Sequence, residues 1–220
     1  MKKICLCCLA LLCLTNLFAQ ETVNYKEKKP YKTWVKMAPK LNDEFFKTPE
    51  AIRIGDNVLL YQQTTGGWPK NIYMPAELTE QELEDVLASK DEVNESTIDN
   101  DATSTEIQYL SRLYLATHIK KYKDSALDGI RYIQFWPRPK VYYTHITYND
   151  NAMVNVMELL REVYEKKAPY EYVPDSICNR ARAAFNKGVE CILKTQVVLN
   201  GKPTVWCAQH DEHTLAPAKA

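Results

Sequence analysis

Six stretches of the chain carry apolar side chains at helical spacing, and this pattern is the strongest constraint on the fold. Residues that end helices, such as the Gly66-Gly67 pair and Pro137, lie between them. Successive amphipathic helices with loops recurring at one end favour stacked helical hairpins. We therefore expect an all-α fold, with an extended segment at 141–148, an irregular segment at 197–220, and helices at 48–63, 78–88, 103–118, 120–132, 149–163 and 176–196.

Two helix starts can be predicted from local chemistry. Thr48 followed by Pro49 places an N-cap residue before a proline at the first helical position. Thr103 followed three residues later by Glu106 has the spacing of a capping box, in which the two side chains satisfy backbone N–H groups reciprocally. The helix that begins there would bury the stripe Ile107, Leu110, Leu113 and Tyr114.

The N-terminal residues predict export. Residues 1–19 place Lys2 and Lys3 before a short apolar run, which indicates a secretory signal peptide and a secreted or periplasmic protein. Residues 20–44 are rich in lysine and are interpreted as an exposed lead-in, and residues 45–220 form one domain. The chain has 28 basic and 28 acidic residues without a basic stripe, which argues against a nucleic-acid partner. We expect a monomer that is not attached to a membrane once the signal is cleaved.

Cysteine and histidine do not form a recognisable site. Cys178, Cys191 and Cys207 would remain after signal cleavage; the first two either pair or stay as free thiols, and none is expected to be catalytic. His210 and His213 flank two acidic residues but do not have the spacing of a zinc site. His145 is either a general base or a hydrogen-bonded residue beneath a loop.

Asp99, Asn100 and Asp101 precede the helix predicted at 103–118. One of these carboxylates either serves as an N-cap or Asx-turn residue, or the group forms an oxygen-rich site for a hard cation such as calcium. The sequence Asn149-Asp150-Asn151 precedes another helix in the same way. In an array of hairpins the two Asp-Asn turns would converge on one face, although two unrelated helix starts would look the same.

Two tryptophans lie in predicted loops. Trp68 and Trp206 are followed by polar residues, namely Lys70 and Asn71 after the first and Gln209 after the second. A flat ring with polar neighbours suits a carbohydrate, and Lys70 would suit an acidic sugar. The alternative is that each tryptophan plugs the end of its helical hairpin.

Four motifs in order resemble the pectate lyases of polysaccharide lyase family ten. They begin at Gly66 (Gly-Gly-Trp-Pro-Lys-Asn), Ile98 (Ile-Asp-Asn-Asp-Ala-Thr), Ile146 (Ile-Thr-Tyr-Asn-Asp-Asn-Ala-Met) and Thr204 (Thr-Val-Trp-Cys-Ala-Gln-His-Asp). The resemblance covers residues 45–220. It implies an (α/α) toroid of helical hairpins, export, and calcium-assisted β-elimination of polygalacturonate, the acidic backbone of pectin.

The resemblance also implies roles for single residues. Asp99 and Asp150 match the essential acidic positions, as catalytic residues and calcium ligands. The local chemistry adds Asp101 as a third expected calcium ligand. The remaining expected residues line the cleft and bind substrate: Lys70, Asn71, Trp206 and Gln209.

Two departures from the family pattern leave alternatives open. The loop around Trp136-Pro137 looks shorter than the corresponding Gly-Gly-Trp-Pro-type loop of the family. The family's catalytic base is an arginine on the C-terminal side of the fourth motif, and no arginine follows Arg182. We therefore expect an incomplete toroid with the base beyond Ala220. The alternatives are an inactive uronate-binding protein and a glycoside hydrolase that uses Asp99 or Asp150 as acid or base.

Overall fold

The structure is a computed structural model that describes residues 27–91, 96–134 and 145–218. The predicted signal peptide and the loop around Trp136 lie outside these residues. Within them the helices are α1 (Tyr31–Met37), α2 (Pro49–Tyr61), α3 (Glu80–Ala88), α4 (Ser104–Thr117), α5 (Lys120–Gln134), α6 (Ala152–Tyr164) and α7 (Asp175–Thr195). All six predicted helices are therefore present.

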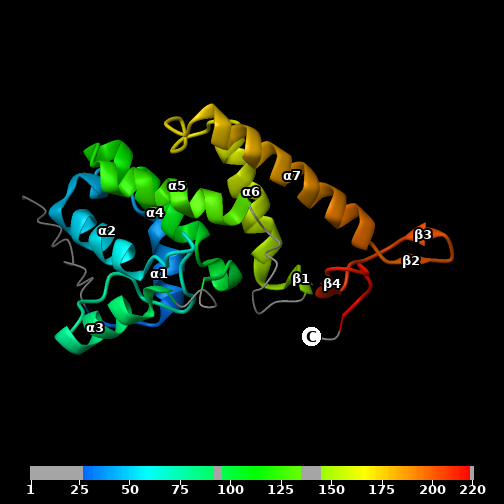
Figure 1. The fold of residues 1–220 in the computed structure, drawn as a ribbon, viewed down its shortest axis with the longest axis horizontal. Helices are drawn as coiled ribbons and strands as arrows, with labels where there is room; N and C mark the ends of the chain where they lie inside the picture. The colour runs from blue at the N-terminus through cyan, green and yellow to red at the C-terminus, as the bar shows by residue number, and fades with distance from the viewer. Residues whose placement is uncertain (1–26, 92–95, 135–144, 219–220) are drawn as a thin grey trace, which may run out of the picture.

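The helices pair as the predicted hairpins. Helix α4 packs against α5, and α6 packs against α7. Helix α2 lies on the α4–α5 pair, and α7 extends along one side of the molecule (Figure 1). Among the described helices, none combines the length and apolar character needed to cross a lipid bilayer.

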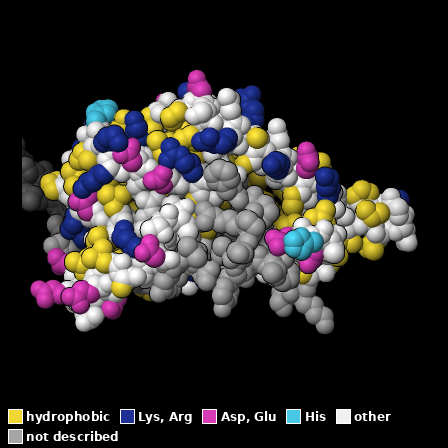
Figure 2. Space-filling view, in the orientation of Figure 1, with side chains coloured by type: hydrophobic (Ala, Val, Ile, Leu, Met, Phe, Trp, Pro, Cys, Tyr) yellow, Lys and Arg dark blue, Asp and Glu magenta, His cyan; other side chains and the backbone are white. Residues whose placement is uncertain are grey.

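Short strands occupy parts of the segment that was expected to be irregular. Strand β1 (His145–Thr147) pairs antiparallel with β4 (Gln209–Asp211), and β2 (Val198–Leu199) pairs with β3 (Lys202–Pro203). The first pair agrees with the extended segment predicted before the second Asp-Asn turn. The β2–β3 hairpin projects beyond the end of α7 (Figure 1) and carries exposed apolar side chains (Figure 2), including Val198 and Leu199.

Local sequence explains the start of α2. The Thr48 hydroxyl accepts a hydrogen bond from the Ala51 amide at 3.2 Å, and Pro49 takes the first helical position, as predicted. Gly55 lies within this helix because a larger residue has no room there: a Cβ would collide with Leu113 of α4. The glycine therefore allows α2 and α4 to approach closely.

The prediction that the lead-in is exposed is wrong at Trp34 and Ala38, which are buried. Helix α1 lies in this segment, and its Trp34 is fully buried. The Trp34 ring packs on Tyr109 with 5.1 Å between ring centroids, and its Nε1 donates to Glu106 Oε1 at 2.7 Å. These partners lie more than 70 residues away in sequence, so local composition does not reveal them.

The predicted capping box at Thr103 is also wrong. The Thr103 side chain makes no capping hydrogen bond to α4. Glu106 is buried, accepts a hydrogen bond from Trp34, and leaves its Oε2 atom without a partner. Burial raises the pKa of Glu106 from 4.5 to about 7, although the hydrogen bond from Trp34 opposes this shift.

We expect stability to fall as pH rises through the range in which Glu106 ionises. The folded protein holds this proton up to about pH 7, whereas the unfolded chain releases it near 4.5. The contribution of protonated Glu106 to the free energy of unfolding is therefore complete below pH 4.5. It is lost progressively between pH 4.5 and about pH 7, by about 3 kcal/mol in total. Urea unfolding of the wild type and of Glu106→Gln at several pH values measures this change.

The glutamine variant resembles the protonated acid in shape, so it should lack this component of the pH dependence. Glu84→Gln, a change on the exposed surface of α3, is the matched control and should keep the wild-type dependence. Identical pH profiles for the wild type and Glu106→Gln would contradict the prediction.

Candidate active site

The two Asp-Asn turns converge, as the hairpin arrangement predicted. They form the short helical turns η4 (Asp99–Asp101) and η5 (Asn149–Asn151), which precede α4 and α6 and contact each other. Both line a cleft of about 310 Å³. Gln209 lines the same cleft from β4, where it pairs with Thr147 of β1. Asn149 and Gln209, which lie about 50 and 110 positions after Asp99 in the sequence, thus line the same cleft as Asp99.

The backbone of these turns suits asparagine and aspartate. Asn100, Asp101 and Asn151 have positive φ angles of 53°, 62° and 59°. Asparagine and aspartate adopt this left-handed conformation at lower cost than most side chains, which explains their recurrence before both helices. The N-cap residue of α4 is Thr103 and that of α6 is Asn151, and neither makes a side-chain capping bond, so the interpretation of Asp99 as the N-cap of α4 is wrong.

Asp99 instead forms an ion pair. Its Oδ2 lies 2.5 Å from Lys70 Nζ, and the two side chains are 24% and 36% exposed. The neighbouring residues are also joined, since the Asn100 amide donates to Asn71 Oδ1 at 3.0 Å. The Gly-Gly-Trp-Pro-Lys-Asn loop is therefore joined to the first Asp-Asn turn, although Lys70 and Asn71 themselves are not among the residues that line the cleft.

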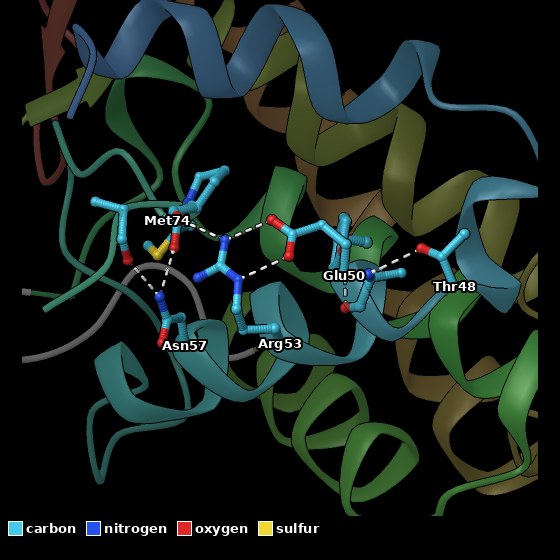
Figure 3. A network of polar contacts seen from close by, with 9 residues as sticks. Thr48, Glu50, Arg53, Asn57 and Met74 are labelled. Carbon is cyan, nitrogen blue, oxygen red and sulfur yellow. Dashed lines mark hydrogen bonds and ion pairs between the residues drawn. The ribbon is translucent and has the colours of Figure 1, made fainter. Parts of the chain in front are cut away.

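Helix α2 anchors the chain that follows this loop (Figure 3). Arg53 makes a bidentate ion pair with Glu50 and donates a hydrogen bond to the carbonyl of Pro75 at 2.8 Å. Asn57 donates to the carbonyls of Met74 and Ala76 at 3.2 and 2.6 Å. These bonds attach residues 74–76, which follow Lys70 and Asn71 in the chain, to a helix of the core.

The two tryptophans differ in role. Trp68 is fully buried and donates from Nε1 to the Val58 carbonyl at 2.8 Å, so it plugs the end of its hairpin. Trp206 is 41% exposed and donates to the Ile192 carbonyl at 2.6 Å. It lines a separate apolar groove of about 390 Å³ between α6 and α7, and Met153 lies in the walls of both the groove and the cleft.

The structure does not bring Asp101 into the cleft with Asp99. Asp101 lines a different hollow of about 320 Å³, where its Oδ1 accepts a hydrogen bond from the Asn155 amide of α6. The positive φ angles at Asn100 and Asp101 turn the chain between the two carboxylates. Asp150 lies in η5, but its side chain is outside the described residues.

Among the described side chains, no group of three His, Cys, Asp or Glu is close enough to hold a metal ion. His210 is buried: its Nε2 accepts from the Cys207 amide at 3.2 Å, and its Nδ1 lies 3.0 Å from the Leu215 carbonyl oxygen. It therefore holds the C-terminal loop. The side chain of His145 is outside the described residues. Cys178, Cys191 and Cys207 are free thiols.

A family model described as pectic acid lyase matches residues 62–220, which include every motif described above. The chain belongs to the pectic acid lyase family. This confirms the resemblance seen in the four sequence motifs. No match was found among curated proteins.

Solved structures of family 10 polysaccharide lyases support this assignment. A family 10 polysaccharide lyase from Cellvibrio cellulosa is 30% identical in sequence to this chain and superposes on it with a TM-score of 0.63. The match covers 90% of this chain and 59% of the lyase chain. A mutant of a family 10 polysaccharide lyase from the same organism, in complex with trigalacturonic acid, has 30% identity and a TM-score of 0.65. That match covers 86% of this chain and 57% of the other. The fold is thus the predicted all-α toroid type, and this pectic acid lyase family member spans less than two thirds of the length of these relatives.

Sequence reasoning missed part of the cleft of this pectic acid lyase family member. The missed residues are the apolar ones that line it, Ile98, Ala152, Met153 and Val156. Asn100 and Asn149, which also line it, belong to the two Asp-Asn turns that the sequence analysis expected to converge. The apolar residues could not have been found, because apolar residues next to a helix start look the same in a sequence whether they face a core or a cleft.

Proposed function

We propose that the protein is a pectate lyase that cleaves polygalacturonate by calcium-assisted β-elimination. The observation that carries this proposal is the half-buried Lys70–Asp99 ion pair beside the cleft where both Asp-Asn turns meet. Membership of the pectic acid lyase family and the trigalacturonic acid bound to a related lyase agree with it.

The charges near the cleft suit a uronate. The Lys70 ammonium, 36% exposed, can bind a substrate carboxylate while remaining paired with Asp99. The amides of Asn71, Asn100 and Gln209 can hold sugar hydroxyls, and the apolar residues that line the cleft can contact the face of a sugar ring. Trp206 would contact the substrate only if the polysaccharide extended past Met153 into the adjoining groove.

The donors in this cleft are of the kind that calcium binds. Asp99, Asn100, Asn149 and Thr147, whose side chains carry carboxylate, amide and hydroxyl oxygens, line it, and calcium prefers oxygen ligands. We propose Asp99 and Asp150 as its protein ligands. Bound calcium would withdraw charge from the uronate carboxylate and so acidify the neighbouring C5–H. Asp99 would hold Lys70 in place against the same carboxylate.

The test is an assay of polygalacturonate cleavage with protein expressed from its complete reading frame. β-Elimination leaves a conjugated double bond, so ultraviolet absorbance should rise, stop on chelation, and recover when calcium is added. New reducing ends without this absorbance would indicate a hydrolase. Binding without cleavage would indicate a uronate-binding protein. The absence of both binding and cleavage would contradict the proposal as a whole.

We also propose that the protein is exported. In this case the mature protein begins near Gln20, and N-terminal sequencing of material recovered outside the cytoplasm provides the check.

A further inference from the structure

The backbone of Thr103, directly before α4, is in an unfavourable conformation. Its φ and ψ angles are 66° and −47°, and the Ser104 amide donates across it to the Ala102 carbonyl at 2.8 Å. This geometry is the rare form of the three-residue γ-turn. A positive φ is costly for a residue branched at Cβ, and such strain persists only where the surrounding structure holds it.

The side chain of Thr103 provides the contacts that hold it. The residue is fully buried, and its hydroxyl donates to the Thr97 carbonyl at 2.7 Å and accepts from the Trp68 amide at 3.0 Å. Trp68 and Thr97 also pair with each other, through a bond from the Thr97 amide to the Trp68 carbonyl at 3.0 Å. One hydroxyl thus joins the loop after α2, the segment before η4, and the start of α4.

Both members of the Lys70–Asp99 ion pair lie next to these contacts. Lys70 is two residues after Trp68, and Asp99 is two residues after Thr97. The Asp99 amide donates to the Thr97 hydroxyl at 3.1 Å, which attaches the turn to the same segment. Thr103 itself does not line the cleft. Its hydroxyl therefore acts on the two charges only through the chain segments that it joins.

We propose that Thr103 is a positioning residue whose hydroxyl sets the geometry of Lys70 and Asp99. The substrate part of this inference rests on the proposed function. Valine would fill nearly the same volume but would remove the partner of the Trp68 amide and of the Thr97 carbonyl, both in a buried place. Serine would keep both hydrogen bonds and lose only a methyl group.

The experiment compares Thr103→Val, Thr103→Ser and the wild type. Thr117→Val is the matched control, because Thr117 also donates its hydroxyl to a carbonyl (Leu113, 2.7 Å) at the far end of the same helix. Two quantities are measured: calorimetric affinity for trigalacturonate with calcium, and hydrogen exchange of the Asp99 amide. Thr103 does not touch this amide, so its exchange rate reports whether the turn stays in place.

We expect Thr103→Val to weaken trigalacturonate affinity about tenfold or more and to speed exchange at the Asp99 amide by a similar factor. Thr103→Ser and Thr117→Val should remain within about threefold of the wild type in both quantities. If Thr103 were needed only for overall stability, Thr103→Val would lower the unfolding midpoint and speed exchange throughout the protein rather than selectively at the Asp99 amide.

The inference is overturned if a folded Thr103→Val protein exchanges its Asp99 amide at the wild-type rate, or if serine fails to rescue. If valine prevents folding, Thr103→Ala removes the same hydroxyl with less bulk, and the same outcomes apply. If the wild type does not bind trigalacturonate at all, the proposed function fails. The exchange rate of the Asp99 amide then still decides whether Thr103 positions the turn.

Discussion

Replacing Asp99 with asparagine should lower the rate of polygalacturonate cleavage by about 100-fold or more, which is the scale of losing one preorganised charged group in an active site. The substitution keeps the shape of the side chain but removes the charge that lies 2.5 Å from Lys70 Nζ. It also removes a charged oxygen ligand from the proposed calcium site. The measurement is the initial rate of ultraviolet absorbance increase, together with calorimetric affinity for trigalacturonate.

Asp128→Asn provides the matched control. Asp128 is an exposed aspartate on α5 that also pairs with a basic residue, Arg131, but lies outside the cleft. We expect its variant to keep wild-type rates. If Asp99→Asn cleaves as fast as Asp128→Asn while both fold, the assignment of Asp99 to the active site is wrong.

Replacing Trp68 with alanine should destabilise the protein by about 3–5 kcal/mol, the usual cost of removing a large aromatic side chain from a core. The side chain is fully buried, packs closely against Gly129 of α5, and donates a hydrogen bond to the Val58 carbonyl. A loss of this size is a large part of the stability of a typical domain. Urea unfolding followed by circular dichroism measures it.

Trp206→Ala is the comparison. Trp206 is 41% exposed, so truncation should cost about 1 kcal/mol or less of unfolding free energy. Equal destabilisation by the two changes would show that Trp206 is also a core residue. Little effect from Trp68→Ala would contradict the role of that ring as the plug of its hairpin.

Helix positions were largely predictable because short-range interactions determine them. The Thr48 cap, the proline after it, and the periodic apolar residues of α4, α5 and α6 all act within one or two helical turns. Errors arose where distant partners decide the outcome. Trp34 looked like part of an exposed lead-in because its partners, Glu106 and Tyr109, lie far along the chain.

The candidate site was predictable in part for the same reason. Repeated Asp-Asn turns and helical hairpins were enough to expect convergence, and the contact between η4 and η5 agrees. Local chemistry could not separate Asp99 from Asp101, because both carboxylates lie in one short turn. The left-handed backbone at Asn100 and Asp101 separates them, so that Asp99 lines the cleft whereas Asp101 accepts a hydrogen bond from Asn155.

The sequence by itself determined the helical hairpins, the family and the turns that carry the acidic residues, because these depend on periodicity and on motifs of a few adjacent residues. Only the tertiary structure decided which side chains meet. It paired Lys70 with Asp99, buried Trp68, left Trp206 in a neighbouring groove, and joined three segments through the Thr103 hydroxyl. These outcomes depend on how whole helices pack, and the packing is set by contacts between residues far apart in the chain.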